Sequence, residues 1–314
     1  ILGAGASRAA CPAGDKNGRL LPLMRDFVQV LDMESLLSKW EIDPHQNFED
    51  IYSDLYQSGE KAKTEELNRI INLYFGEMKL PDNPNLYDHL ILSMRSKDLI
   101  ATFNWDPLLV EAVSRNQASG LKLPRLVFLH GNVAVGYCSV CGKKGRRLAD
   151  CDKCAERLIK TPLLYPVKEK NYADDTFISN EWRILKRDMG SAFMITIFGY
   201  SGPKTDAEAI TAMKAGWGDP NERSMEQTAF ISTQREEDIA ENWDAFIHSH
   251  HYEVQNDFYE SWIANHPRRT GEAYMHQYID AKFIDNNPIP KDLNFPELWA
   301  WYAQFKEPEE RNPD

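Results

Sequence analysis

Three short apolar runs, each followed by polar or glycine residues and then by a helical pattern, constrain the fold of this chain most strongly. They occupy residues 99–103, 125–129 and 193–198. The first run ends on Asn104, Trp105 and Asp106, and Pro107 then suits a helix start because its φ is already helical. Uninterrupted apolar runs of this length are typical of parallel strands that are covered on both faces. We therefore expect an α/β protein with helices on both faces of a parallel sheet.

The chain begins on an apolar pair and turns through Gly3, Ala4 and Gly5 to Ser7. Glycines allow a tight turn and a close approach to a ligand, and the helix that follows offers free N–H groups to a phosphate. The full G-x-G-x-x-G pattern is absent, so a plain turn remains an alternative. Because the first residue is Ile1, we expect the chain to start inside its first strand.

Polar side chains follow the other strand ends. His130 follows run 125–129, and Gly199 and Ser201 follow run 193–198. Ligands of open α/β sheets bind outside the carboxyl ends of the strands, so Asn104, Asp106 and His130 are placed for chemistry. The Gly199 segment is either a turn or a second contact to a ribose or phosphate.

Four of the five cysteines form two C-x-x-C pairs: Cys138 with Cys141, and Cys151 with Cys154. Two such turns complete a tetrahedral site for Zn²⁺, and four protein ligands leave no position for water, so the metal is expected to be structural. A redox pair is the alternative. With no secretory signal in the sequence, metal is favoured over disulfides, and the cytoplasm is the expected compartment.

The composition of the chain limits the kinds of partner that it can bind. The net charge of -12 and the basic residues dispersed along the chain argue against direct nucleic-acid binding. No apolar run is long enough to span a membrane. Between residues 27 and 95 the apolar spacing predicts helices, and further along we expect a strand at 228–232 and a helix at 236–249.

Taken in order, these motifs resemble the sirtuin family. The resemblance covers residues 1–235 and rests on Gly3-Ala-Gly-Ala-Ser7, Thr102-Phe-Asn104-Trp-Asp106, His130-Gly131, the cysteine pairs and Gly199-Tyr-Ser201. It implies a discontinuous Rossmann-like NAD-binding domain made of residues 1–30, 98–136 and 161–270. Residues 31–97 would be a helical insertion, 137–160 a zinc ribbon, and 271–314 a tail that docks on the body or a partner.

The resemblance also implies roles for single residues. Asn104 and Asp106 would bind the ribose and the nicotinamide, and His130 would be the general base. The cofactor would be lined by Gly3, Ala4, Gly5, Ser7, Thr102, Gly199 and Ser201.

Several departures separate the chain from the protein deacylases of that family. Phe103 replaces a glutamine, Tyr200 replaces a threonine, and Leu163-Leu-Tyr-Pro replaces F-G-E. The pattern is more similar to sirtuin-like effectors of bacterial anti-phage defence, which hydrolyse NAD. We therefore expect an NAD hydrolase. Protein deacylation or ADP-ribosyl transfer, and a sensor that binds NAD or ADP-ribose without turnover, are the alternatives.

A free NAD hydrolase would be toxic, so we expect its activity to be restrained. The means would be a homo-oligomer, a partner ATPase or sensor protein, or the loop from Cys11 to Gly18, which we expect to be mobile and near the ligand.

Overall fold

The computed structural model describes residues 1–166, 172, 175–202, 206–223, 225–248 and 251–311. Its strands are β1 (Leu99–Thr102), β2 (Arg125–Phe128), β3 (Val135–Tyr137), β4 (Lys144–Arg146), β5 (Ile159–Lys160), β6 (Met194–Phe198), β7 (Gln227–Ile231) and β8 (Tyr252–Gln255). Its α-helices are α1 (Ala4–Ala10), α2 (Phe27–Val30), α3 (Glu34–Lys39), α4 (Phe48–Gln57), α5 (Lys61–Gly76), α6 (Leu86–Ser93), α7 (Leu108–Asn116), α8 (Thr176–Ser191), α9 (Ala207–Trp217), α10 (Glu236–Trp243), α11 (Trp262–Asn265), α12 (Thr270–Tyr278), α13 (Phe295–Tyr302) and α14 (Lys306–Arg311).

The start of the chain joins two groups of parallel strands into one sheet. β1 pairs with β2, and β7 pairs with both β6 and β8, all in parallel. Leu2 forms parallel bridges to Thr102 on one side and Phe198 on the other. Its N–H donates to the carbonyl of Ala101 at 2.7 Å, and its carbonyl accepts from the N–H of Phe103. The strand order is therefore β2, β1, the strand at Leu2, β6, β7, β8.

This order is the doubly wound one in which the first strand is central and the chain winds outward to both edges. It confirms the expected α/β class with a parallel sheet. Each of the three apolar runs is a strand, and Pro107 directly precedes α7. Two details differ from the sequence expectations: β8 was not foreseen, and α10 ends at Trp243 although a helix was expected up to residue 249, which lies outside the described residues.

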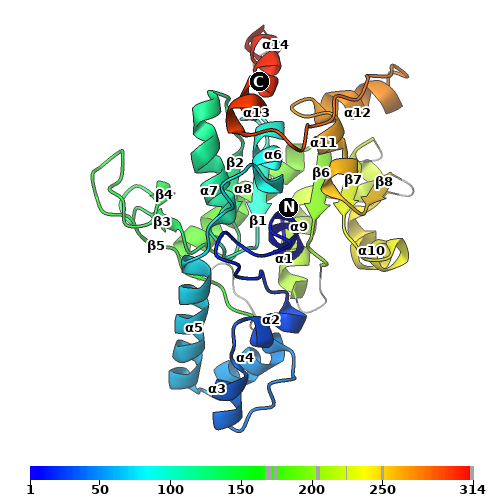
Figure 1. Ribbon diagram of the computed structural model, residues 1–314. Coiled ribbons are helices and arrows are strands. Elements are labelled where there is room, and N and C mark those ends of the chain that lie inside the picture. The colour runs from blue at the N-terminus through cyan, green and yellow to red at the C-terminus, as the bar shows by residue number, and fades with distance from the viewer. Residues whose placement is uncertain (167–171, 173–174, 203–205, 224, 249–250, 312–314) are drawn as a thin grey trace.

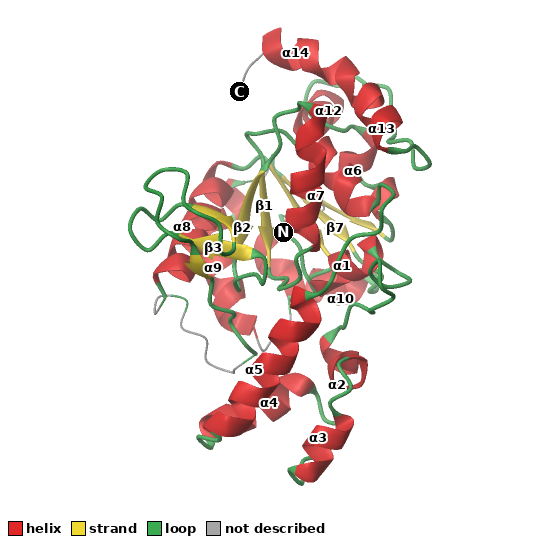
Figure 2. Cartoon of the chain, turned by 60° about the vertical axis from the view of Figure 1, so that its left-hand side comes forward, coloured by secondary structure: helices red, strands yellow, loops and turns green. Residues whose placement is uncertain are grey.

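Side chains alternate between the two faces of the sheet and build two hydrophobic cores. Ile100, Phe198 and Ile231 pack with α1, α6, α7 and α11 on one face. Ala101 and Phe230 pack with α8, α9 and α10 on the other. Figure 2 shows the strands between these two layers of helices.

Helices α2 to α5 form a lobe at the bottom of Figure 1. Their apolar stripes meet in an aromatic cluster in which Phe27 stacks on Phe48 with ring centroids 4.4 Å apart. Trp105 joins this cluster from the end of β1, because its ring lies 6.2 Å from Phe27 and 5.9 Å from Phe75. The middle residue of the Asn-Trp-Asp segment therefore anchors the lobe to the sheet.

The last helices pack on the body. The hydroxyl of Tyr302 lies 2.7 Å from that of Ser93, and the indole of Trp299 donates to Asn116 at 2.9 Å. Among the helices that the structure describes, none is long and apolar enough to cross a membrane.

Candidate active site

Three glycines let the chain start approach the end of β6 closely. The N–H groups of Gly3 and Gly5 donate to the carbonyls of Phe198 and Gly199, both at 3.0 Å. A Cβ on Gly3 would lie 2.5 Å from the Gly199 carbonyl oxygen. Gly199 has φ +63°, and its Cβ would lie 2.2 Å from the nitrogen of Ala6. The contact between these two segments therefore explains Gly3, Gly5 and Gly199, which we predicted as cofactor contacts.

At the start of α1, most of the backbone N–H groups already donate to carbonyls of the protein. Ala4 is the first residue of this helix and is half-buried. The next two N–H groups, of Gly5 and Ala6, donate to protein carbonyls at 3.0 Å. A phosphate cradle at this helix start, as the glycine pattern suggested, would have few donors left.

A polar network connects α1, α6 and the end of β1. Ser7 donates to the Oδ2 atom of Asp106 at 2.7 Å and accepts from the Asn104 amide at 2.8 Å. Its Oγ also lies 2.6 Å from the Tyr87 hydroxyl. Because Ser7 has one hydrogen to give, Tyr87 must donate in that contact. The hydroxyl of Ser7 thus has all its hydrogen-bonding capacity filled.

Asn104 keeps one polar atom available. Its amide nitrogen donates to the Gly3 carbonyl at 2.9 Å and to Ser7, which uses both hydrogens. No residue in the described ranges donates to its Oδ1. This half-buried oxygen can accept a hydrogen bond from a hydroxyl group or a water molecule.

Asp106 is a buried carboxylate with no cationic partner among the residues that the structure describes. It is 4% exposed, and its two oxygens accept from Ser7 and from the N–H of Leu108 at 3.1 Å. Burial raises the pKa of Asp106 from 3.8 to about 6, although the hydrogen bond from Ser7 opposes that shift. The protein therefore holds this side chain close to its titration point near neutral pH, which is common at functional sites.

Two further side chains hold the Asn-Trp-Asp segment in place. The Oγ1 atom of Thr102 accepts from the N–H of Asn104 at 3.0 Å. The Asn132 amide donates to the carbonyl of Asp106 at 2.7 Å and to that of Asn104 at 3.3 Å. Thr102 thus supports the backbone of Asn104 through its side chain.

His130 belongs to a second cluster, on the other face of the sheet. Its ring lies 4.8 Å from that of Phe103, edge to face, and its Nε2 atom lies 3.2 Å from the Tyr172 hydroxyl. Tyr172 and Tyr200 both donate to the buried carboxylate of Asp206, at 3.3 Å and 2.8 Å. Burial and this carboxylate hold the pKa of both tyrosines well above the ordinary value. Ser7, Asn104 and Asp106 are thus brought together, while His130 contacts a neighbouring group of residues.

Ser201 and the loop from Cys11 to Gly18 are the remaining features that the sequence placed near the ligand. Ser201 is exposed, and its carbonyl accepts from the Asn242 amide at 3.5 Å. The loop from Cys11 to Gly18 is tied down by Asp15, whose carboxylate accepts backbone N–H groups of Asn17 and Lys79 at 2.8 Å and 3.0 Å.

Four residues of these clusters carry little signal in the sequence: Tyr87, Asn132, Tyr172 and Asp206. Tyr87 occupies an apolar helix where a tyrosine is ordinarily a core residue, and only the fold reveals its hydroxyl as a partner of Ser7. Asp206 could have been noticed, because a carboxylate just before a helix and after a glycine turn is a common ligand or cap position.

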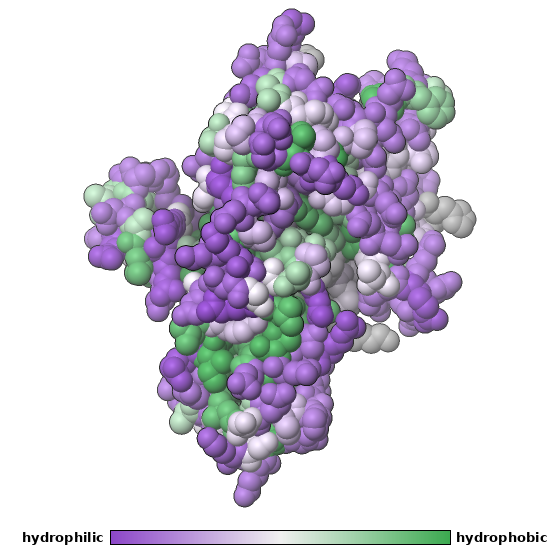
Figure 3. Space-filling model, viewed as in Figure 1, coloured by the Kyte–Doolittle hydropathy of each residue, from purple (hydrophilic) through white to green (hydrophobic). Residues whose placement is uncertain are grey.

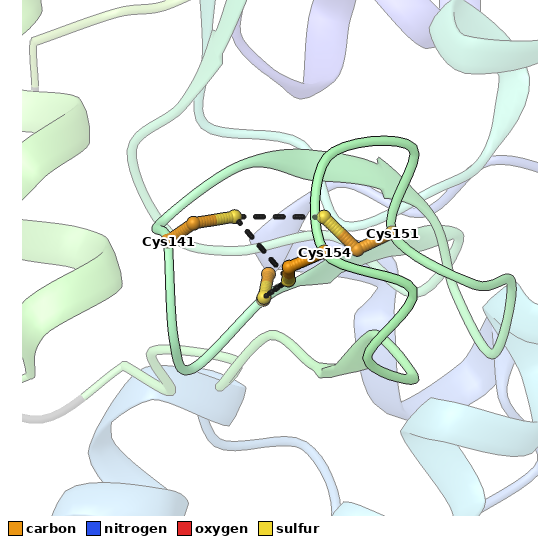
Figure 4. A group of neighbouring side chains, drawn as sticks. Cys141, Cys151 and Cys154 are labelled. Carbon is orange, nitrogen blue, oxygen red and sulfur yellow. Dashed lines mark hydrogen bonds between the residues drawn. The ribbon is translucent and has the colours of Figure 1, made fainter.

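The four cysteines lie in the two connections of a small antiparallel sheet of β3, β4 and β5, where their side chains meet (Figure 4). Their sulfur atoms all lie within 4.8 Å of one another, with pairs at 3.3 Å, 3.5 Å and 3.8 Å. A tetrahedral ion with Zn–S bonds of about 2.3 Å would space its sulfurs by about 3.8 Å. Backbone N–H groups of Cys141 and Val140 lower the pKa of Cys138 to about 7, which favours the thiolate that binds metal. The cluster therefore fits Zn²⁺, held by Cys138, Cys141, Cys151 and Cys154.

A separate cavity lies away from these residues. It measures about 630 Å³ and opens at the amino ends of the strands, where Leu99 of β1 and Met194 of β6 line it. None of the predicted site residues is among its lining residues.

Fold and site together define a doubly wound α/β protein with polar residues at the carboxyl ends of its central strands and a four-cysteine cluster that could hold a metal ion. No protein-family model and no curated protein matches the chain. Among the solved structures that it resembles are Sir2 structures.

One is a variant Sir2 homologue in complex with 2'-O-acetyl-ADP-ribose, with 14% identity and a TM-score of 0.44, over 87% of both chains. Another is a complex of a Sir2 homologue with NAD, with 14% identity and a TM-score of 0.36, over 97% of this chain and 88% of the other. A third, from work on the mechanism and regulation of Sir2 enzymes, has 14% identity and a TM-score of 0.38, over 98% and 91%.

Proposed function

We propose that this protein hydrolyses NAD at the bond between nicotinamide and ribose and releases nicotinamide and ADP-ribose. The observation that carries the proposal is the position of Ser7, Asn104 and Asp106. They gather where the strand at Leu2 and β1 end, beside the point at which the strand order reverses. Dinucleotides bind at this point in doubly wound sheets.

The residues are assigned roles from the chemistry of the reaction. Breaking the bond leaves positive charge on the ribose carbon, and a water molecule must then add to it. Asp106 holds the nicotinamide carboxamide, for which its oxygens retain lone pairs. Asn104 orients the ribose or the attacking water through its Oδ1 atom. His130 takes a proton from that water or from a ribose hydroxyl.

The departures from the deacylase motifs support hydrolysis over deacylation. Phe103 and Tyr200, which stand where deacylases carry a glutamine and a threonine, stack on each other with ring centroids 4.2 Å apart and 18° between the planes. The two replacements thus form one aromatic contact, which also touches His130 through Phe103. Two stacked aromatic rings therefore stand in place of two polar side chains next to His130, the proposed base.

The decisive experiment mixes the purified chain with NAD in the absence of any peptide. Release of nicotinamide supports hydrolysis. Release that requires an acyl-lysine peptide indicates a deacylase, a role that the four-cysteine module would also suit. Binding without turnover indicates a sensor.

His130→Ala tests the assigned base. We expect turnover to fall by about 10² to 10⁴, the usual contribution of a placed base. His266 provides the control, since it is also buried and stacks on Trp262 at 4.9 Å, far along the chain from these residues. Unchanged turnover in His130→Ala, or an equal loss in His266→Ala, would contradict the role.

The biological setting is proposed on the sequence resemblance alone. As an anti-phage effector, the wild-type chain should lower cellular NAD when it is expressed, whereas His130→Ala should not. Restraint by a partner ATPase or sensor protein would appear as lower turnover in a co-expressed complex.

A further inference from the structure

The four-cysteine module is basic although the chain is acidic. Residues 143–160 contain seven Lys and Arg against three Asp and Glu, whereas the whole chain contains 36 against 48. This segment is an exception to the dispersed basic residues noted above. Lys143 pairs with Asp152 at 3.0 Å, and Lys144 with the buried Glu181 at 2.7 Å. The exposed basic residues that form no ion pair within the described ranges are Arg146, Lys153, Arg157 and Lys160.

Apolar side chains are exposed among these cations. Val140, Leu148 and Ile159 are 70%, 50% and 44% exposed. Figure 3 shows the module as a lobe on the left, with green side chains between purple ones. Single-stranded nucleic acid would favour exposed aromatic rings, and the one aromatic residue of this sheet, Tyr137, is half-buried. Exposed aliphatic groups between cations favour an acidic protein surface.

The helical lobe carries such a surface. Residues 41–66 contain eight Asp and Glu against two Lys. Helix α4 and its neighbours border a groove of about 350 Å³. Its acidic lining residues are Glu41, Asp43, Asp54 and Glu60, and its apolar ones are Ile42, Ile51 and Leu55. Lys63 is its one basic lining residue and lies 3.5 Å from Glu60.

We propose that the four-cysteine module of one copy of this chain docks into the acidic groove of a second copy. The charges of the two surfaces are opposite, and each combines its charges with exposed or lining aliphatic side chains. Module and groove lie apart in both views of the chain, the module beside the sheet and the groove on the lower lobe (Figures 1 and 2). The contact is therefore between copies, and it closes into a pair or ring when the rotation permits.

This interface is independent of the proposed NAD chemistry, because its surfaces contain none of the residues assigned to that site. It would supply the self-association that we expect as a restraint on activity.

Sedimentation of the full chain, loaded with zinc, tests the proposal. At 50 mM salt we expect reversible association, which weakens at 500 mM because screening reduces attraction between exposed charges. The module variant Arg146→Glu/Arg157→Glu and the groove variant Asp54→Lys/Glu60→Lys should each associate at least ten-fold more weakly than the wild type.

A mixture of the module variant and the groove variant gives a more specific test than either variant alone. An equimolar mixture of the two variants retains one native module and one native groove, so it should form pairs of one copy each. A chain that carries all four substitutions should associate with itself again, since both charges are reversed.

A matched control for the module variant is Arg183→Glu/Arg187→Glu on α8, which lowers the net charge by the same amount and should leave association intact. Circular dichroism and zinc content verify that every variant is folded. A wild-type chain that stays monomeric at 50 mM salt, or a variant mixture that does not pair, would overturn the proposal.

Discussion

Replacing Asp106 by Asn should stabilise the protein near neutral pH while it abolishes turnover. Asp106 is buried and has no cationic partner in the described part of the chain, so folding removes its charge from water without an ion pair in return. Its pKa in the folded chain is about 6, against an ordinary value of 3.8. At about 1.4 kcal/mol per pH unit, the ionised carboxylate destabilises the fold by about 3 kcal/mol.

The gain in the variant is smaller than this, because the amide NH₂ group faces the Ser7 hydroxyl, which loses its acceptor, and a buried donor without an acceptor costs about 1–3 kcal/mol. Asn keeps the shape of the side chain and one oxygen for the N–H of Leu108. We therefore expect the free energy of unfolding to rise by about 1 kcal/mol above pH 7.

The sign of the pH dependence follows from the raised pKa. The folded chain binds the proton of Asp106 more tightly than the unfolded chain, so this group favours folding fully below about pH 4. That contribution is lost as the pH rises through about 6. The stability difference between variant and wild type should thus increase between pH 4 and pH 7 and remain constant above it.

Urea unfolding at a series of pH values measures this difference. Asp88→Asn is the matched control, because Asp88 is also fully buried but forms an ion pair with Arg115. Its loss leaves a partly buried guanidinium without its partner and should destabilise by about 3 kcal/mol. An Asp106→Asn variant that is less stable than the wild type at pH 7.5, with a difference that does not vary with pH, would refute the reasoning.

Two other predictions concern the glycine contact and the metal. Gly199→Ala should lower the free energy of unfolding by about 3 kcal/mol, because the Cβ meets the nitrogen of Ala6 at 2.2 Å and φ is +63°. Gly59→Ala, with φ +75° and no atom within 4 Å, should lower it by about 1 kcal/mol in the same urea titration, and equal losses would contradict the close-contact argument. Cys138→Ser should abolish stoichiometric zinc in elemental analysis and reduce solubility, because the metal stabilises a module with a very small core. Cys11→Ser should keep the metal, since this buried thiol lies outside the cluster, and a zinc-bound Cys138→Ser chain would exclude the assigned ligand.

Elements with a local signal were predictable from the sequence. β1, β2 and β6 are short, predominantly apolar stretches, the composition typical of strands that are covered on both faces. β8 escaped prediction because Tyr252-Glu-Val-Gln255 has no apolar run. Its side chains are all half-buried, and its pairing with β7 depends on a partner more than twenty residues earlier.

The site was predictable only in part, for a similar reason. Asn104 and Asp106 flank one residue and follow a strand, so a local pattern places them together. Ser7 joins them across 97 and 99 residues of sequence. Its glycine turn indicated the right place, and the close contact with Gly199 adds a packing reason for the missing side chains. No local pattern links Tyr87 to Ser7, because only the packing of α1 on α6 brings their hydroxyls together.

The alternation of strand residues also limits how a ligand can use the site. Phe103 and Asn104 are consecutive at the end of β1, so their side chains leave opposite faces of the sheet. Phe103 lies in the group of side chains that contains His130, Tyr172 and Tyr200. Asn104 lies in the group that contains Ser7 and Tyr87. A small molecule seated on one face would contact one group only. A ligand that uses both the amide and the imidazole must lie across the strand ends, and an extended dinucleotide meets that requirement. If nucleotide binding were weakened by Asn104→Ala but unaffected by Tyr200→Ala, the ligand would be confined to one face, and His130 could not act on it.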